Sequence, residues 1–506
     1  MTTTTIRLPA AQPPGTVLGT APDSAETADA YRAAGGYAGS TDPGELLAHL
    51  AASGLRGRGG AGFPAAVKLR SVRDRGDGGG HGVRPVVVAN GEEGEPGSAK
   101  DRWLLRARPH LVLDGLTRAA AVTGAVRGFV YLSDPAAGES VRRALAEHPP
   151  PLPVEVVETD HTYVAGEETA VVRRIDGGPA LPAAKPPRPY ERGVGGAPTL
   201  IANVETLARI ALTATRPDLR HDIARGTLVT LSGRPAATAV LTEVPYGIPL
   251  RSLASRYGMP DATGALMGGL FGGLVDAGAL DLPLEPGALT AAGTALGCGA
   301  IRFLAPGTCP VATAADAAAH LAAESARQCG VCVSGTAAVG DALGALAAGT
   351  AGPDTADRLD RWASGLPGRG ACGLLDAAAG IAGSLLRSFP RQVRSHLAAP
   401  CPVCAAGVPA EGRRRLTVAV PQVAGPSTAA FPAHPAAHPT PDPTAPPSEP
   451  PTAPLPPGPF APPAATPSAR PSARPTTPLS VPHPSPSAAT SAPPSAPPLP
   501  ALKGTP

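Results

Sequence analysis

The sequence predicts an α/β domain followed by a small β-rich module, a helical bundle and a long tail without regular structure. Three observations predict this order. Apolar runs alternate with helix-like segments over 31–216, short β-type runs follow from 226, and alanine and leucine recur at helical spacing over 312–396. Beyond about 424 the chain is almost entirely Pro, Ala, Ser and Thr. We therefore expect three folded parts ahead of a disordered tail.

The predicted boundaries separate five segments of the 506-residue chain. They are a flexible N-terminus at 1–30, the α/β domain at 31–218, the β-rich module at 219–300, the helical bundle at 301–405 and the tail at 406–506. A chain of this length holds several folded units, because single hydrophobic cores stop growing at about 250–300 residues. The tail carries much of the chain's 65 prolines and too little large apolar surface to offset the entropy of ordering it.

Strands of the first domain are expected at 86–89 (VVVA) and 128–132 (GFVYL), with a helix over 111–122 between them. A further apolar strand is expected to end at Gly166, where the chain turns into a helix. The β-rich module is expected to begin with the run at 226–233 (GTLVTLSG). Strand-to-helix transitions of this kind are typical of ligand sites in open α/β sheets.

The charge pattern excludes some classes of function. A net charge of +3 and a pI near 8.5, spread evenly, do not suggest a nucleic-acid groove or a polybasic membrane patch. The chain shows neither a basic start followed by an apolar run nor about 18 uninterrupted apolar residues. We expect a cytoplasmic protein that neither binds nucleic acid nor inserts into a membrane, although docking to a membrane complex stays open.

Seven cysteines lie in the second half of the chain, an odd number that does not favour a disulfide framework. They are Cys298, Cys309, Cys329, Cys332, Cys372, Cys401 and Cys404. Two of the pairs have C-x-x-C spacing, which in a reducing compartment is typical of metal or cluster ligands.

The first candidate binding motif is a glycine-rich loop in SGLRGRGGAGFPAAVK, which includes Gly57, Gly59 and Gly60. Glycines let the backbone approach a ligand closely and turn N–H groups inward as an anion nest, to which a following helix adds its positive end. Arg58 could face a phosphate with two parallel hydrogen bonds, and Lys68 adds a charge further along. By itself such a loop is more often only a structural turn.

The second motif, NGEEGEPGSAKDR, places Asn90 and three carboxylates, Glu92, Glu93 and Glu95, directly after the strand at 86–89. An amide can both donate and accept hydrogen bonds, which suits the edge of a flavin ring, while glutamates suit ribose hydroxyls or a nicotinamide amide. A solvated acidic turn is the alternative.

The third motif, YVAGEETA, repeats this design with Glu167 and Glu168 after Gly166. Lys185 and Asn203, the latter within TLIANVETL near another helix start, follow downstream. The repetition favours a binding site over separate surface turns.

Taken together, these motifs resemble the 51-kDa-type flavoprotein that admits NADH to respiratory complex I, the family of NADH-quinone oxidoreductase F subunits. Relatives occur in NAD-reducing hydrogenases and formate dehydrogenases. The match runs from about 35 to 396 and rests on SGLRGRGGAGFP, EEGEPGSxKDR, GEETA and ANVETL jointly. The resemblance implies a Rossmann-like FMN-binding domain, a ubiquitin-like SLBB module and a helical bundle that carries a [4Fe–4S] cluster.

The resemblance also implies roles for individual residues. It assigns Gly57, Gly59, Lys68, Asn90, Glu92, Gly166, Glu167 and Asn203 to FMN, and Phe63, Glu95, Glu168 and Lys185 to NADH. Arg58, Gly60 and Glu93 lie beside them in the same motifs. No acid–base catalyst is implied, because the hydride passes between cofactors that the protein positions.

The cluster motif of the family, E-S-C-G-x-C-x-P-C-R with a fourth cysteine about forty residues later, is incomplete here. In ESARQCGVCVSG we match Cys329 and Cys332 to the first two cysteines and Cys372 to the distant one, which leaves Gly335 at the third. One hypothesis is that Cys404 or Cys401, in PCPVC, folds back as the fourth ligand. Zinc binding by that pair, or buried thiols without a ligand, are the alternatives.

The implied function is a flavoprotein oxidoreductase that takes a hydride from NADH on FMN and passes electrons, through the cluster, to a partner redox protein or quinone-reducing complex. The alternative is a degenerate, non-catalytic protein of the same fold that acts as a scaffold or nucleotide sensor.

Overall fold

The computed structural model describes residues 4–6, 16–39, 42–78, 83–234, 238–406 and 416–426. Of the tail predicted at 406–506, the part beyond 426 lies outside these residues. The described residues belong to one compact unit.

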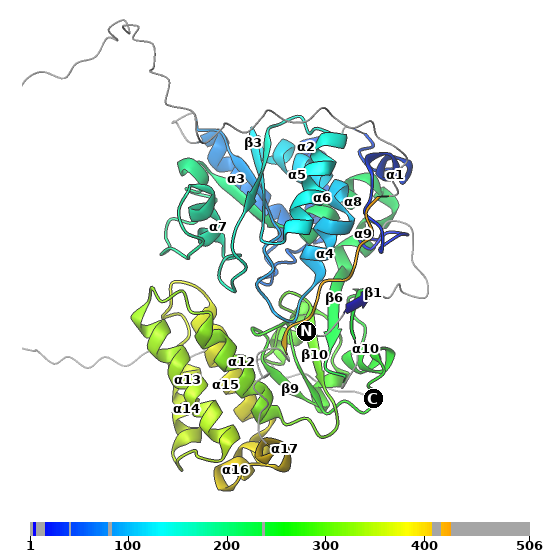
Figure 1. The fold of residues 1–506 in the computed structure, drawn as a ribbon. Helices are drawn as coiled ribbons and strands as arrows, with labels where there is room; N and C mark the ends of the chain where they lie inside the picture. The colour runs from blue at the N-terminus through cyan, green and yellow to red at the C-terminus, as the bar shows by residue number, and fades with distance from the viewer. Residues whose placement is uncertain are drawn as a thin grey trace, which may run out of the picture. The chain divides into compact units, whose positions relative to one another are not determined.

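A parallel four-stranded sheet forms the centre of the first domain, in the order β4-β3-β2-β5 (Figure 1). Its strands are β2 (Val86–Asn90), β3 (Arg127–Leu132), β4 (Val154–Glu158) and β5 (Thr199–Asn203). Side chains of β2 alternate between two apolar cores: Val87 and Ala89 pack on one face, and Val86 and Val88 on the other. Both faces are covered, as parallel sheets require. The predicted α/β class is confirmed.

Helices surround this sheet. They are α1 (Ala28–Ala33), α2 (Pro43–Ser53), α3 (Ala65–Gly78), α4 (Lys100–Ala107), α5 (Pro109–Thr123), α6 (Pro135–Glu147), α7 (Glu168–Ile175), α8 (Val204–Thr215) and α9 (Arg220–Arg225). Since β3 and β4 follow β2 on one side and β5 lies on the other, the strand order reverses between β2 and β5. The carboxyl ends of these two strands therefore flank the place where open α/β sheets bind ligands.

The apolar run expected to be a strand ending at Gly166 is a turn, and the strand in this part of the chain is β4. The turn is fixed by a side chain from β3: the Tyr131 hydroxyl donates to the carbonyl of Ala165 at 3.1 Å. Apolar character at Val164 and Ala165 reflects burial of that turn.

A mixed six-stranded sheet follows, in the order β1-β7-β6-β10-β8-β9. Its elements are β1 (Thr4–Ile6), β6 (Gly226–Ser232), β7 (Ala239–Pro245), α10 (Leu250–Tyr257), β8 (Gly264–Leu266), β9 (Leu274–Asp276), α11 (Pro286–Ala291) and β10 (Ala300–Leu304). The expected strand at 226 is present, and the module's sheet extends to β10. Its assignment as an SLBB module stays a prediction.

Both ends of the described chain are ordered where the sequence predicted flexibility. In the predicted flexible segment 1–30, β1 pairs with β7, and Val17 and Leu18 are fully buried. In the predicted tail from 406, Leu416 and Val418 are buried, and residue 424 pairs with residue 24 in a parallel bridge. The composition of these segments is low in complexity, so their few apolar side chains gave no clear signal in the sequence. Burial of these side chains offsets the entropy lost when the backbone becomes ordered.

The helical bundle consists of α12 (Pro310–Ala323), α13 (Gly330–Ala348), α14 (Thr355–Gly365), α15 (Leu374–Ser388), α16 (Pro390–Ala398) and α17 (Pro402–Ala405). Figure 1 shows α12 to α15 side by side, with α16 and α17 at one end. By length and composition, α13 is the one helix among the described residues that could cross a membrane. Its Val339, Leu343 and Leu346 pack into the bundle core.

Candidate functional site

The glycine-rich loop lies against the carboxyl end of β5. A Cβ atom added at Gly59 would lie 3.2 Å from the Cβ of Asn203, so only a glycine allows this approach without displacement. Gly60 and Gly62 have φ values of 112° and 60°, which L side chains rarely adopt. The loop then passes directly into α3, whose first N–H groups have no carbonyl partner within the helix itself.

Asn90 joins the second and third motifs. Its register partner on β5 is Asn203, so the two amides stand at the ends of adjacent strands. The Asn90 Nδ2 donates to the carbonyl of Gly166 at 2.9 Å, while its Oδ1 accepts from the Glu92 amide at 3.2 Å. A Cβ at Gly166 would lie 3.0 Å from the Glu92 carbonyl oxygen. Three segments separated in sequence thus converge at the switch point of the sheet.

The Glu92 carboxylate is buried and only partly satisfied. Its Oε1 lies 3.1 Å from Nδ1 of His161, whereas its Oε2 has no hydrogen-bond partner within the described part of the chain. A buried carboxylate oxygen without a donor is costly, by about 1–3 kcal/mol or more. The arrangement suits a ligand that brings a hydroxyl or N–H group to this point, as a flavin or its ribityl chain can.

A second group of charged side chains lies around Glu168. The Lys185 Nζ is 2.6 Å from Glu167 Oε1 and 3.1 Å from Glu168 Oε1. Burial opposes the charge on Lys185, but its hydrogen bonds to the two glutamates outweigh burial and raise its pKa. Burial lowers the pKa of Lys68, against the opposing influence of Glu168. Phe63 is 52% exposed, so its ring is free to receive a planar group.

Glu95 lies away from this group, against the second sheet. Its Oε2 accepts from the Leu270 amide at 3.0 Å and from the Tyr163 hydroxyl at 3.4 Å. Burial of the carboxyl raises the pKa of Glu95 to about 7. The side chain is therefore protonated in a substantial fraction of molecules near neutral pH.

Arg58 and Glu93 have structural partners. The Arg58 guanidinium is buried and donates to the carbonyls of Arg56, Ala224 and Gly226 at 2.7 to 2.9 Å. These hydrogen bonds hold the glycine-rich loop against the start of β6. The donors of Arg58 therefore contact backbone carbonyls, whereas the sequence led us to expect a contact with phosphate. Glu93 accepts from the Asp101 and Arg102 amides at 3.1 and 3.2 Å and so satisfies two N–H groups in the first turn of α4.

Sequence reasoning missed a buried network behind the loop, although its members lie in the motifs already identified. Lys100 Nζ is 2.6 Å from Asp101 Oδ1 and 3.3 Å from Glu205 Oε2. The Asn203 Nδ2 donates to Asp101 Oδ2 at 2.7 Å, and its Oδ1 caps α8. Asn203 is thus held in place by this network. The sequence signal for this network was the KDR run at 100–102 and the VET run at 204–206, which follow residues already assigned to the site.

Three of the predicted cluster cysteines are neighbours. Cys329 precedes α13, Cys332 lies in the first turn of that helix, and Cys372 precedes α15. Burial raises the pKa of Cys372, and the nearby Cys332, Glu167 and Cys329 add to the effect. Cys329, Cys332 and Glu167 therefore lie near enough to Cys372 to affect its ionisation.

A cysteine at position 335 would press against its neighbours before its thiol could join these cysteines. A Cβ at Gly335 would lie 2.8 Å from a methyl group of Leu375 and 3.4 Å from one of Leu366. Counted from Glu324 and Ser325, which match the first letters of the family motif, the missing cysteine falls instead on Ala326. Cys329 and Cys332 then take the second and third positions. This register agrees with the packing around Gly335.

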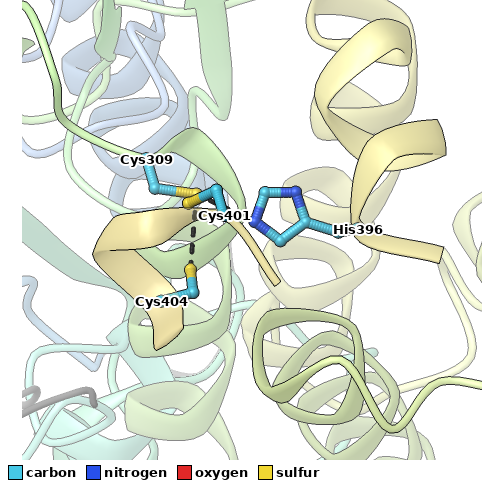
Figure 2. Close-up of side chains that lie close together, drawn as sticks. All are labelled: Cys309, His396, Cys401 and Cys404. Carbon is cyan, nitrogen blue, oxygen red and sulfur yellow. Dashed lines mark hydrogen bonds between the residues drawn. The ribbon is translucent and has the colours of Figure 1, made fainter. Parts of the chain in front are cut away.

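Cys404 lies in a different group of ligands. Its Sγ is 3.6 Å from Sγ of Cys309, and the pair lies with His396 and Cys401, all four ligand atoms within 4.8 Å of one another (Figure 2). In this structure Cys404 and Cys401 therefore have Cys309 and His396 as their neighbours, and the hypothesis that one of them completes the Cys329 set gains no support from this arrangement. Their partners are residues that the sequence analysis did not assign.

Comparison with known proteins agrees with this geometry. Residues 50–212 match the Nuo51 FMN-binding domain, and residues 312–396 match the NADH-ubiquinone oxidoreductase-F iron-sulfur binding region. The F subunit of the Streptomyces coelicolor NADH-quinone oxidoreductase is 31% identical over 405 residues, which cover 74% of this chain and 89% of the relative. A relative from Rhizobium meliloti, also an NADH-quinone oxidoreductase F subunit, is 30% identical, with 72% and 93% covered.

The chain belongs to the family of NADH-quinone oxidoreductase F subunits. The NAD+-reducing [NiFe]-hydrogenase in its air-oxidised state has a chain of similar fold, with a TM-score of 0.61 and 28% identity over 70% of this chain. This chain spans 63% of that hydrogenase chain. The family's two functional regions contain the two sites described above: the glycine loop and its carboxylates in one, and Cys329, Cys332 and Cys372 in the other. The non-catalytic alternative gains no support from the comparisons.

Proposed function

We propose that this chain is a flavoprotein of the complex I type that oxidises NADH and passes the electrons through an iron–sulfur centre to a partner redox subunit. The observation that carries the proposal is the convergence of the glycine loop, Asn90 and Glu92 at the switch point between β2 and β5. Bound there, FMN would accept the hydride of NADH and release its electrons singly to the cluster.

Toward FMN, we assign the phosphate to the loop amides of 57–62 and to the amino end of α3, with Lys68 adding charge. Asn90 and Asn203 present amides at the ends of β2 and β5, suited to the polar edge of the ring. The unpartnered Glu92 Oε2 takes a donor of the cofactor. The network around Lys100 keeps Asn203 from turning away.

Toward NADH, we assign the exposed ring of Phe63 to the adenine and the carboxylates of Glu167 and Glu168, held by Lys185, to the ribose. Acidic side chains repel the 2′-phosphate of NADPH, so NADH is the expected donor. Glu95 stays assigned to NADH by the resemblance alone, because its carboxylate lies against the second sheet and already accepts from Leu270 and Tyr163.

Tyr163 supports the transfer of electrons from the flavin to the cysteines. Its hydroxyl reaches Glu95, its amide donates to Glu324, and its ring stacks on Phe271 at 6.4 Å between centroids. Phe271 in turn lies against Gly373, next to Cys372. These contacts form a packed connection from the segment of Glu95 to the segment of Cys372. We propose that the acceptor is a separate redox subunit and that the chain works in the cytoplasm.

The test is the visible spectrum of the purified full chain. We expect flavin absorption, bleaching on anaerobic addition of NADH, and much slower bleaching with NADPH. Iron and sulfide analysis, with EPR of the dithionite-reduced protein, tests the cluster separately. Protein that is colourless and cannot be reconstituted with FMN would overturn the proposal.

A further inference from the structure

Four side chains of metal-binding type meet at the end of the bundle, apart from the Cys329 set. Cys309 lies directly before α12, His396 in the last turn of α16, Cys401 directly before α17 and Cys404 within that short helix (Figure 2). All four ligand atoms lie within 4.8 Å of one another. Figure 2 shows the sulfurs of Cys309, Cys401 and Cys404 close to one another and the His396 ring turned toward them.

Two of the spacings match the ligands of one tetrahedral ion, and all of them are at most 4.8 Å. Bond lengths of about 2.3 Å for Zn–S and about 2.0 Å for Zn–N, at tetrahedral angles, separate two sulfurs by about 3.8 Å and a sulfur from a nitrogen by about 3.5 Å. Here Cys309 Sγ is 3.6 Å from Cys404 Sγ and 3.4 Å from His396 Nε2. An iron–sulfur cubane puts each thiolate on a different iron and so spreads its ligands further apart.

The imidazole is held in the form that binds metal. Nδ1 of His396 lies 2.7 Å from the carbonyl oxygen of Gln392, so Nδ1 carries the proton and donates it. The lone pair of Nε2 therefore faces the sulfurs. Metal-bound histidines almost always have this second hydrogen bond, because it fixes the tautomer and the ring orientation.

Burial and chain order also fit a structural site. Cys309, His396 and Cys404 are 2 to 7% exposed, which leaves little room for a reacting substrate. The sulfurs are unbonded to one another, since all of these cysteines are free. Buried thiols without a ligand can serve as small apolar groups, but that role does not account for an imidazole nitrogen aimed at three of them.

We propose that Cys309, Cys401, Cys404 and Nε2 of His396 bind one Zn²⁺ in a closed, four-coordinate structural site. Binding displaces the protons of the three thiols, so Zn²⁺ with three thiolates and a neutral imidazole carries a net charge of −1. The ion fastens α16 and α17 to the start of α12, and so secures the last helices of the bundle. This site is independent of the flavin function, because none of its ligands lies among the residues assigned to FMN, NADH or the cluster.

The test is metal analysis of the full chain by mass spectrometry, purified from medium that contains zinc and iron. We expect about one zinc per chain in the wild type. Cys404→Ser should lower the zinc content by roughly tenfold or more. Cys298→Ser is the matched control, since Cys298 lies outside both ligand groups, and should keep its zinc. Cys332→Ser should lower iron and keep zinc.

Wild-type protein without zinc, or zinc retained in Cys404→Ser, would overturn the site. Iron that depends on Cys404 would also overturn it in favour of an iron centre. If Cys404→Ser does not fold, the wild type decides: zinc is removed with a chelator and replaced by Co²⁺. A tetrahedral d–d spectrum with thiolate-to-cobalt charge transfer supports the site, and a weak six-coordinate spectrum rejects it.

Discussion

The backbone amide of Tyr163 donates a 3.1 Å hydrogen bond to Oε2 of Glu324, and this bond joins the turn before Glu167 to the segment that precedes the cysteines. The two residues are 161 positions apart in the chain. The flavin side and the cluster side of the proposed electron path are therefore fastened to each other by a contact that neither motif reveals alone.

Loss of this contact should slow electron exit more than electron entry. Glu324→Ala leaves the Tyr163 amide without its acceptor, at a cost of about 1–3 kcal/mol, and loosens the segment before Cys329. We expect flavin bleaching by NADH to change little, while reduction of the cluster slows by roughly tenfold. Stopped-flow spectroscopy separates the two steps. Glu324→Gln keeps an acceptor oxygen and should lie close to the wild type; equal loss of both steps in Glu324→Ala would contradict the assignment.

Ala326→Cys should complete the set of cluster thiolates. If the register from Glu324 and Ser325 is right, this substitution supplies the missing fourth ligand, and iron and sulfide per chain should rise. Gly335→Cys is the matched variant, and its new side chain meets Leu375. We expect it to lower stability without raising iron. More iron in Gly335→Cys than in Ala326→Cys would show that the register with the gap at Gly335 is the correct one.

Glu92→Ala should weaken flavin binding. The substitution removes the carboxylate oxygen assigned to a donor of FMN, and loss of a charge-assisted hydrogen bond of about 1.5–3 kcal/mol corresponds to a Kd for FMN raised by roughly tenfold to a hundredfold. Fluorescence titration of the apoprotein with FMN measures it. Glu92→Asp keeps the charge, one methylene shorter, and should lose much less. An unchanged Kd in Glu92→Ala would remove Glu92 from the flavin site.

Glu95 should make stability depend on pH near neutrality. Because burial raises its folded-state pKa from 4.5 to about 7, the folded protein holds this proton more tightly than the unfolded chain between those values. Stability contributed by the protonated carboxyl is therefore lost as pH rises through about 7. Glu95→Gln has no such proton, so its Tm relative to the wild type should rise between about pH 5 and pH 8. A constant difference across that range would contradict the raised pKa.

Several elements of the fold could be predicted from the sequence because their signals are local. The β2 strand is a run of valines followed by Asn90 and glutamates. This pattern is enough to predict a buried parallel strand whose carboxyl end lies at a ligand-binding edge of the sheet. The order of the three folded parts likewise follows from changes in composition. The β1 strand and residues 416–426 could not be predicted, since their order depends on partners more than 200 residues away in sequence, such as β7 for β1.

Within the candidate site, the sequence identified which motifs bind but not what each side chain does. Arg58 illustrates this: a guanidinium in a glycine loop favours a phosphate, yet the fold places carbonyls of 224 and 226 within reach of its donors. A buried guanidinium satisfies its hydrogen bonds with whatever acceptors packing supplies. The sequence cannot say which acceptors those are.

By itself, the sequence determined the α/β class, the flavin motifs and the family. Glycines, strand ends and carboxylates at fixed short spacing can be recognised within a short stretch of chain, without knowledge of distant contacts. Only the tertiary structure decided the partners of Cys404. A C-x-x-C pair specifies two ligands of a metal site, while the others come from any helices that pack nearby. Here they are Cys309, 95 residues earlier, and His396, and they meet because α12, α16 and α17 share one apolar core.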